Sequence, residues 1–156
     1  VKRFNESANN IDFEARATQA GRNPYEVLTV ASLLEGEVIP EDFAKVAAVV
    51  YNRLKADMPL QLDSTVSYAL GLNELELSAT QLDTDSPYNT YKVSGLPPTP
   101  INSPGEAALE AALSPAKGKW LYFVTVNPDT GETKFAKTYE RFLKLKDQYR
   151  DFLASR

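Results

Sequence analysis

The sequence predicts an α+β domain in which helices come first and a β-hairpin comes late. Apolar residues recur at helical spacing through residues 11–56, residues 120–137 hold a β-rich run around a turn, and residues 139–154 return to helical spacing. A chain of 156 residues, 43% of them hydrophobic and 24% charged, suits one hydrophobic core. We therefore expect a single domain over residues 1–156.

The first half is predicted to consist of helices. Residues 11–20 are expected to form a short helix, and Asn23 caps a second helix over residues 24–38, with proline at its first position. Proline and two acids open a third helix at residue 40, which continues to about residue 56. The link between the second and third helices is so short that their apolar faces must share a core.

The middle of the chain is predicted to be mostly irregular. Residues 58–62 alternate as a short extended segment, and one or two helical turns follow and end at Gly71. Ser78 begins another turn with a capping box. Five prolines within residues 83–105 disfavour regular structure, so we expect a long, stiff loop that packs on the domain.

The last third is predicted to contain a helix, a hairpin and a C-terminal helix. Ser103, Pro104 and Glu106 provide the cap, proline and acid of a helix start, which predicts a helix over residues 104–113. Residues 120–126 form the best strand of the chain, and residues 132–137 return as its partner after turn residues. The final helix, 139–154, places Phe142, Leu145, Tyr149 and Phe152 at helical spacing.

The composition excludes several kinds of chemistry. The chain has no histidine and no cysteine, which removes His-dependent nucleophile systems, thiol chemistry, disulfides and the usual zinc sites. Seventeen Lys and Arg against 21 Asp and Glu leave a net charge of −4, so nucleic acid is not an expected partner. No metal or organic cofactor is implied, and no segment has the roughly 18 to 20 apolar residues of a membrane span.

Glu35 is the residue that helix geometry singles out. At about 100° per residue it falls inside the apolar arc of the second helix, on one ridge with Leu28, Ala31 and Val38. A carboxylate in that arc is expected to lose hydration, which favours the neutral form that a general acid needs. Glu37 lies at the border of the arc, and we interpret it as the more ordinary acid.

A structural explanation of Glu35 stays open at this point. Its side chain could reach the edge of a cleft, or pair with a cation of the next helix such as Lys45 or Arg53, because ion pairs also place acids on helix faces.

Five blocks of the sequence, in this order, resemble the catalytic domain of the endolytic murein transglycosylases, the YceG-like family. They are residues 31–37 (ASLLEGE), 46–54 (VAAVVYNRL), 60–66 (LQLDSTV), 86–91 (SPYNTY) and 95–101 (GLPPTPI). The resemblance implies a lytic transglycosylase, a lyase that cuts nascent peptidoglycan strands internally between N-acetylmuramic acid (MurNAc) and N-acetylglucosamine (GlcNAc) and leaves 1,6-anhydro-MurNAc ends. The catalytic glutamate of the family falls on Glu35.

The resemblance also implies a place of work and partners. The substrate would be peptidoglycan glycan strands, with cell-wall synthases as a further partner, at the extracytoplasmic face of the bacterial cytoplasmic membrane. Members of the family usually carry a membrane-spanning N-terminus and a LysM-like subdomain upstream. Residues 1–156 contain neither, so we expect membrane contact only through such an anchor.

Six residues of the resembling blocks are candidates for binding the sugar, because amide, carboxylate and aromatic groups suit hydroxyls and pyranose rings. They are Asn52, Gln61, Asp63, Tyr88, Asn89 and Tyr91. Structural roles stay open for each: solvent exposure, a strand edge, a helix cap or core packing.

Two positions depart from the family pattern. Gly36 stands where lysine is frequent. Family members often have a histidine in the hairpin just before the phenylalanine that corresponds to Phe135, whereas Thr133 and Lys134 stand here. No histidine can therefore assist catalysis.

Two other functions are compatible with the same residues. A peptidoglycan hydrolase (a muramidase) would use Glu35 as the acid and Glu37 or Asp63 to activate water, with the carboxylates roughly 6.5 to 9.5 Å apart for inversion. A non-catalytic cell-wall-binding or scaffold domain would use the tyrosine-bearing loop as an interaction surface and Glu35 as a structural acid.

Overall fold

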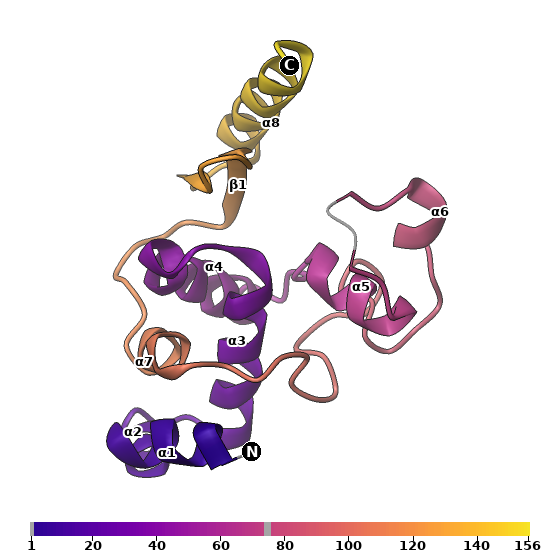
Figure 1. Ribbon diagram of the computed structural model, residues 1–156. Helices are drawn as coiled ribbons and strands as arrows, with labels where there is room; N and C mark the ends of the chain where they lie inside the picture. Colours follow the sequence, from indigo (N-terminus) through magenta and orange to yellow (C-terminus); the bar gives the residue numbers. More distant parts are fainter. Residues whose placement is uncertain (1, 74–75) are drawn as a thin grey trace.

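The computed structural model describes residues 2–73 and 76–156, with side chains from residue 5 onward (Figure 1). The elements are α1 (Lys2–Asn10), α2 (Phe13–Gln19), α3 (Pro24–Glu37), the 3₁₀ turn η1 (Pro40–Asp42), α4 (Phe43–Lys55), α5 (Asp63–Leu70), α6 (Ala79–Leu82), α7 (Glu106–Leu113), β1 (Tyr122–Asn127), β2 (Glu132–Ala136) and α8 (Tyr139–Ala154). The predicted α+β class is confirmed.

Helix α3 forms the centre of the core. It packs against α2, α4, α5 and α7, and the consecutive residues Leu33 and Leu34 are both fully buried, so it is enclosed on more than one face. Leu109 of α7 is equally buried. On the outside of this core, Arg16 of α2 donates from both terminal nitrogens to the two carboxylate oxygens of Glu110, each at 2.7 Å. At its C-terminal end, the last turn of α3 emerges from the core.

Some local signals at helix ends agree with the structure and others do not. The helix predicted from residue 104 begins at Glu106, and its N-cap residue is Gly105, without the predicted side-chain cap. Asn23 caps α3 by accepting a hydrogen bond from the Tyr25 backbone N–H at 2.8 Å. The third predicted helix is divided, since residues 40–42 form the separate turn η1 before α4 begins at Phe43. Helix α1 was not predicted.

The long loop packs on the extended segment before α5, as expected. The Gln61 backbone N–H donates to the Thr90 carbonyl at 3.1 Å, and the Leu62 N–H donates to the Thr90 hydroxyl at 2.8 Å. The capping box between Ser78 and Gln81 is present. Residues 83–105 form turns and bends without helix or strand. This segment and α5 make one side of the molecule in Figure 1.

The hairpin and α8 extend from the helical core in another direction (Figure 1). β1 and β2 pair antiparallel, with Tyr122 opposite Ala136, and Gly131 takes the positive φ of 80° that the turn requires. The Tyr122 ring stacks on Phe142 of α8, with centroids 4.8 Å apart. No helix in the described part of the chain is both long and apolar enough to span a membrane.

Candidate active-site groove

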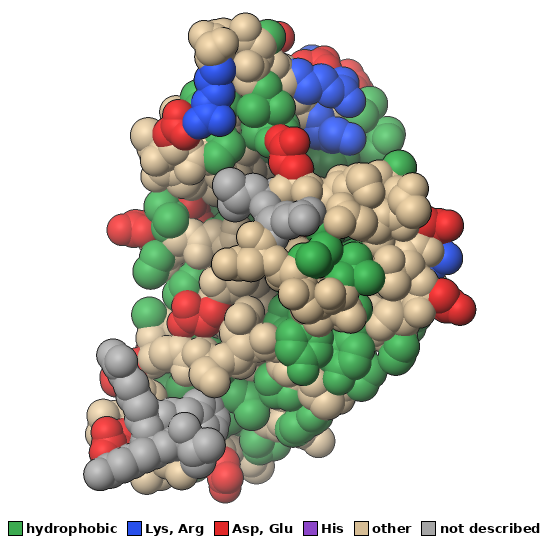
Figure 2. All heavy atoms as spheres, turned by 45° about the vertical axis from the view of Figure 1, so that its right-hand side comes forward, with side chains coloured by type: hydrophobic (Ala, Val, Ile, Leu, Met, Phe, Trp, Pro, Cys, Tyr) green, Lys and Arg blue, Asp and Glu red, His purple; other side chains and the backbone are tan. Residues whose placement is uncertain are grey.

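A groove of about 1340 Å³ lies where the core, the α5 segment and the arm made by the hairpin and α8 meet. It exceeds the roughly 300 to 1,000 Å³ of a small-molecule pocket, and such a volume suits part of a polymer. Four predicted site residues line it: Glu35, Gln61, Asp63 and Tyr91. Figure 2 shows one face of the molecule, on which lysine and arginine side chains gather mainly at the upper end, acidic side chains are scattered, and hydrophobic side chains form a patch from the middle downward.

Glu35 lies in the last turn of α3, and its side chain is exposed at the groove. The predicted burial in an apolar arc is wrong, because packing of α3 ends at Leu34 and the last turn leaves the core. The Oε1 atom of Glu35 accepts a hydrogen bond from the Gly105 backbone N–H at 2.8 Å. Within the described residues, Oε2 has no hydrogen-bond partner, so one carboxylate oxygen is anchored and the other can meet a ligand.

Among the described residues, Glu35 forms no ion pair with a cation of α4, which was the alternative explanation. The Arg53 side chain instead donates to backbone carbonyls, at 2.6 Å to Leu121 and 2.7 Å to Pro59. Lys45 lies over aromatic rings, with its ammonium 5.3 Å from the Trp120 centroid. Glu35 is therefore not held as the partner of either cation.

Glu37 is the acid that loses hydration. It is half-buried, and its Oε1 accepts hydrogen bonds from the Ser64 hydroxyl and, at 3.2 Å, from the Ser64 backbone N–H. Burial raises the pKa of Glu37 to about 7 even though both Ser64 hydrogen bonds act to lower it. The interpretation of Glu37 as the more ordinary acid was wrong, because the α5 segment covers it.

The two glutamates hold the starts of two different helices. Gly105 is the N-cap residue of α7, and Ser64 is the second residue of α5, whose N-cap position is Leu62; neither helix has a side-chain cap of its own. Glu35 and Glu37 supply acceptors for these unpaired N–H groups. The last turn of α3 thus ties the walls of the groove together.

Gly36 allows this close approach. A β-carbon at this position would lie 3.1 Å from the Ser64 β-carbon and 3.0 Å from the Asn102 side-chain nitrogen, closer than most such contacts. Glycine at this position, where the family frequently has lysine, therefore leaves room for Ser64 and Asn102. The α5 segment can lie directly against the backbone between the two glutamates.

Gln61, Asp63 and Tyr91 form the polar wall next to these acids. Gln61 is exposed and has a left-handed backbone with φ of 54°, a conformation that residues other than glycine adopt at a cost and that often occurs at functional sites. The Tyr91 hydroxyl donates to Asp63 Oδ1. Burial is the largest cause that raises the pKa of Tyr91, and the hydrogen bond to Asp63 is the next. The phenol therefore stays a neutral donor.

Asn52 does not line the groove, and its amide is already used. Its Nδ2 atom donates to the carbonyls of Gly118 and Trp120, both at 2.9 Å. Together with Arg53, it fixes the linker between α7 and β1 on α4. We predicted that Asn52 contacts sugar. In the structure its amide nitrogen instead helps to position the hairpin.

Tyr88 and Asn89 also lie outside the groove. The Tyr88 hydroxyl hydrogen-bonds the Thr99 hydroxyl at 2.8 Å, and its ring lies 5.0 Å from that of Tyr68. Asn89 is fully buried and donates to two loop carbonyls, Leu82 and Thr84, each at 2.8 Å. A buried amide whose donors are satisfied holds the loop together and cannot reach a sugar.

The sequence analysis missed the aromatic wall of the groove. Phe123 of β1 and Tyr139, Phe142 and Tyr149 of α8 line it. Phe142 and Tyr149 were assigned to one apolar helix face, yet of the residues at that spacing only Leu145 is buried. Tyr149 within this helix face could have indicated the groove from sequence, because tyrosine suits a surface that is partly exposed to water.

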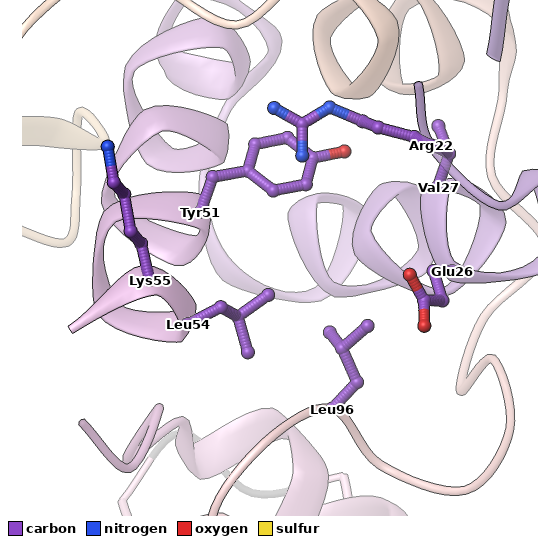
Figure 3. Close-up of a pocket in the computed structure, with 7 residues that line it drawn as sticks. All are labelled: Arg22, Glu26, Val27, Tyr51, Leu54, Lys55 and Leu96. Atoms are coloured by element: carbon purple, nitrogen blue, oxygen red, sulfur yellow. The ribbon is translucent and has the colours of Figure 1, made fainter. Parts of the chain in front are cut away.

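A second cavity of about 320 Å³ lies between α3, α4 and the long loop (Figure 3). The Arg22 guanidinium lies 3.6 Å above the centre of the Tyr51 ring, and the Tyr51 hydroxyl donates to the Ala112 carbonyl at 2.7 Å. Burial raises the pKa of Tyr51 to about 12. No predicted site residue lines this cavity, so the candidate chemistry lies in the larger groove.

Comparison with known proteins identifies relatives of this chain. An endolytic murein transglycosylase of Bacillus subtilis (strain 168) is 46% identical over 126 residues, which cover 80% of this chain and 34% of that protein. One from Streptococcus pneumoniae serotype 2 (strain D39 / NCTC 7466) is 41% identical over 121 residues, covering 74% of this chain and 22% of that protein. The chain thus spans between 22% and 34% of the length of these curated relatives.

A solved structure and a family model agree with these matches. The crystal structure of a YceG-like protein from Listeria monocytogenes superposes with a TM-score of 0.81 at 42% identity, covering 88% of this chain and 45% of that one. The model of the YceG-like family matches residues 1–148. The chain therefore belongs to the YceG-like family.

Proposed function

We propose that this chain is the catalytic part of an endolytic murein lytic transglycosylase in which Glu35 acts as both acid and base. The observation that carries the proposal is the state of Glu35: it lies in a polymer-sized groove with Oε1 anchored by Gly105 and Oε2 without a partner in the described chain. The names of the curated relatives support the substrate class.

One carboxyl group is enough for the proposed reaction. Protonated Glu35 donates its proton to the glycosidic oxygen, the bond from that oxygen to C1 of MurNAc breaks, and GlcNAc leaves with the proton as a hydroxyl. The acetamido group of the substrate stabilises the positive charge at C1. Glu35, now a carboxylate, takes the proton of the MurNAc 6-hydroxyl as that oxygen bonds to C1. Glu35 is protonated again, no water is consumed, and a 1,6-anhydro end results.

Substrate binding supplies the desolvation that the open groove lacks. A glycan strand lying across the exposed Glu35 would displace water from its carboxyl group and favour the neutral acid. Geometry at catalytic groups often tightens only in the complex. Gln61, Asp63 and Tyr91 line the same groove, and we propose that they bind hydroxyl or acetamido groups of the strand.

The test is the new chain end made by purified protein on uncrosslinked glycan. Wild type should release products lighter by one water than hydrolytic products, and Glu35→Gln should abolish turnover with an unchanged thermal unfolding transition. Glu37→Gln is the matched control, because it alters a glutamate of the same turn but keeps an acceptor for Ser64. Full activity of Glu35→Gln would contradict the assigned role.

A muramidase is the second candidate, and the half-buried Glu37 is the observation that favours it. A second carboxylate in the groove could activate water instead of leaving the reaction to the 6-hydroxyl. Ordinary reducing ends in the products, together with inactivity of Glu37→Gln, would establish hydrolysis. A scaffold domain would show no turnover at all, and its glycan binding would survive Glu35→Gln.

We also propose where this activity is used. The substrate is made at the extracytoplasmic face of the bacterial cytoplasmic membrane, so the domain would work there, beside the synthases that extend the strands. Fractionation of cells that produce the tagged parent protein, followed by crosslinking, tests both points. A cytoplasmic parent protein would contradict the proposal.

A further inference from the structure

Helix α8 presents one continuous stripe to the groove. Its groove-lining residues recur at steps of three or four along the helix, which places them on one face. They are Tyr139, Phe142, Lys146, Tyr149 and Leu153. At 1.5 Å per residue the stripe is about 21 Å long, so it forms an extended wall rather than a point contact.

Lys146 is the cation within this stripe, and its charge is not neutralised by a carboxylate in the described residues. The side chain is half-buried, with its ammonium 5.5 Å from the Phe142 ring centroid. Two other cations at the C-terminal end have partners, because Arg150 pairs with Asp147 and Arg156 with Asp129. Lys146 therefore offers ammonium donors to the groove from a position over an aromatic ring.

The remaining groups around Lys146 leave this charge available. The acid of the same wall, Glu76, accepts a hydrogen bond from the Tyr149 hydroxyl at 2.9 Å. The acids Glu35, Glu37 and Asp63 line another part of the groove and are bonded to Gly105, Ser64 and Tyr91. The groove thus has an acidic part that suits neutral sugar rings and an aromatic part in which Arg156 is paired with Asp129 while Lys146 is not paired with a carboxylate of the described residues.

We propose that Lys146 and the rings beside it form a subsite for a carboxylate on the short peptides that murein glycan carries. This inference rests on the proposed function, because it concerns the same groove. The tyrosine and phenylalanine faces suit the apolar parts of a peptide, and a lysine beside them provides a charge-assisted hydrogen bond to a carboxylate. The subsite makes peptide-bearing strands better ligands than bare strands.

A carboxylate can come from two parts of the substrate, and the experiment separates them. Amidase treatment removes the peptides and exposes the lactyl carboxylate of MurNAc, which lies close to the sugar ring. The ligands are therefore labelled peptide-bearing strands, amidase-stripped strands, and chitin oligomers, which have no carboxylate. Binding is measured by fluorescence anisotropy with Glu35→Gln protein, so that no ligand is cut.

Lys146→Met is the informative variant, since it removes the ammonium that lies over Phe142 and keeps an unbranched side chain. Lys144→Met is the matched control, because Lys144 is an exposed lysine of the same helix that does not line the groove. We expect Lys146→Met to raise the Kd for peptide-bearing strands about five- to tenfold, which corresponds to about 1.0 to 1.4 kcal/mol, the net contribution of one hydrogen bond. The Kd for stripped strands and chitin should change less than about twofold, and Lys144→Met should change none of the three.

Each outcome decides the matter. A loss of affinity for stripped strands alone would assign Lys146 to the lactyl carboxylate, which is free only in those strands, and would overturn the peptide subsite. An equal loss for peptide-bearing and stripped strands would show that the contact does not depend on the peptide, and would overturn it too. Unchanged affinity for all three ligands would overturn it as well. If wild type binds peptide-bearing strands in a Lys146-dependent manner but cuts no glycan, the proposed reaction fails while the subsite stands.

Discussion

The half-buried Glu37 predicts a specific pH dependence of stability. Its pKa is raised from 4.5 to about 7 in the folded protein. Between these values the folded state keeps a proton that the unfolded state has released, so the free energy of unfolding falls as the pH rises. The contribution is fully present below pH 4.5 and is lost above about pH 7, where both states are ionised.

The size of the effect follows from the same two values. They lie about 2.5 pH units apart, and each unit corresponds to about 1.4 kcal/mol, so the change is on the order of 3 kcal/mol. Residual hydration of a half-buried carboxylate makes this an upper limit. Glu37→Gln removes the titration but keeps a carbonyl oxygen that can accept both Ser64 hydrogen bonds.

The assay is urea denaturation of wild type and Glu37→Gln between about pH 4 and about pH 8, because subtracting the two curves cancels all other titrating groups. Relative to the variant, wild type should lose between 1 and 3 kcal/mol over this range, by the roughly 1.4 kcal/mol per unit given above. Parallel curves for the two proteins would refute the reasoning. A loss of wild-type stability relative to the variant as the pH falls would show instead that Glu37 is stabilised as a carboxylate.

Three further predictions concern residues outside the catalytic groups. Asn89→Ala should destabilise the fold by about 2 kcal/mol in urea denaturation, because the carbonyls of Leu82 and Thr84 lose a buried donor. The same variant should leave the KM for glycan unchanged. A raised KM without a loss of stability would show that Asn89 binds the substrate. Asn52→Ala should speed amide hydrogen exchange in residues 118–121, which a purely local role at the surface would not do. Leu109→Ala should cost 2 to 5 kcal/mol in the same denaturation assay, and a cost below about 1 kcal/mol would contradict its full burial.

Local chemistry explains why many element boundaries could be predicted. A cap such as Asn23 acts on N–H groups within three residues, and the Ser78 capping box closes on itself, so both signals are complete within a short segment. The hairpin turn likewise depends on neighbouring residues and a glycine with positive φ. Helix α1 was missed because its mean hydropathy is low and Phe4 and Ala8 are its only apolar residues, too few to establish a helical period from sequence.

The candidate site could be predicted only in part. Glu35, Gln61, Asp63 and Tyr91 were recognised through the ordered blocks, and the structure places all four in one groove. Asn89 belongs to the same block as Tyr91 but turns into the loop, since a sequence block does not say which of its polar side chains is consumed by backbone carbonyls.

By itself, the sequence determined the α+β class, the central helix, the hairpin and the resemblance to the YceG-like family, because these depend on periodicity and on short ordered motifs. Only the tertiary structure decided which glutamate is desolvated. Glu35 meets a backbone N–H 70 residues away at the end of a solvent-exposed turn, whereas Glu37 is covered by a segment 27 residues away. Hydration depends on what packs over a side chain, and helix spacing cannot describe partners contributed by distant parts of the chain.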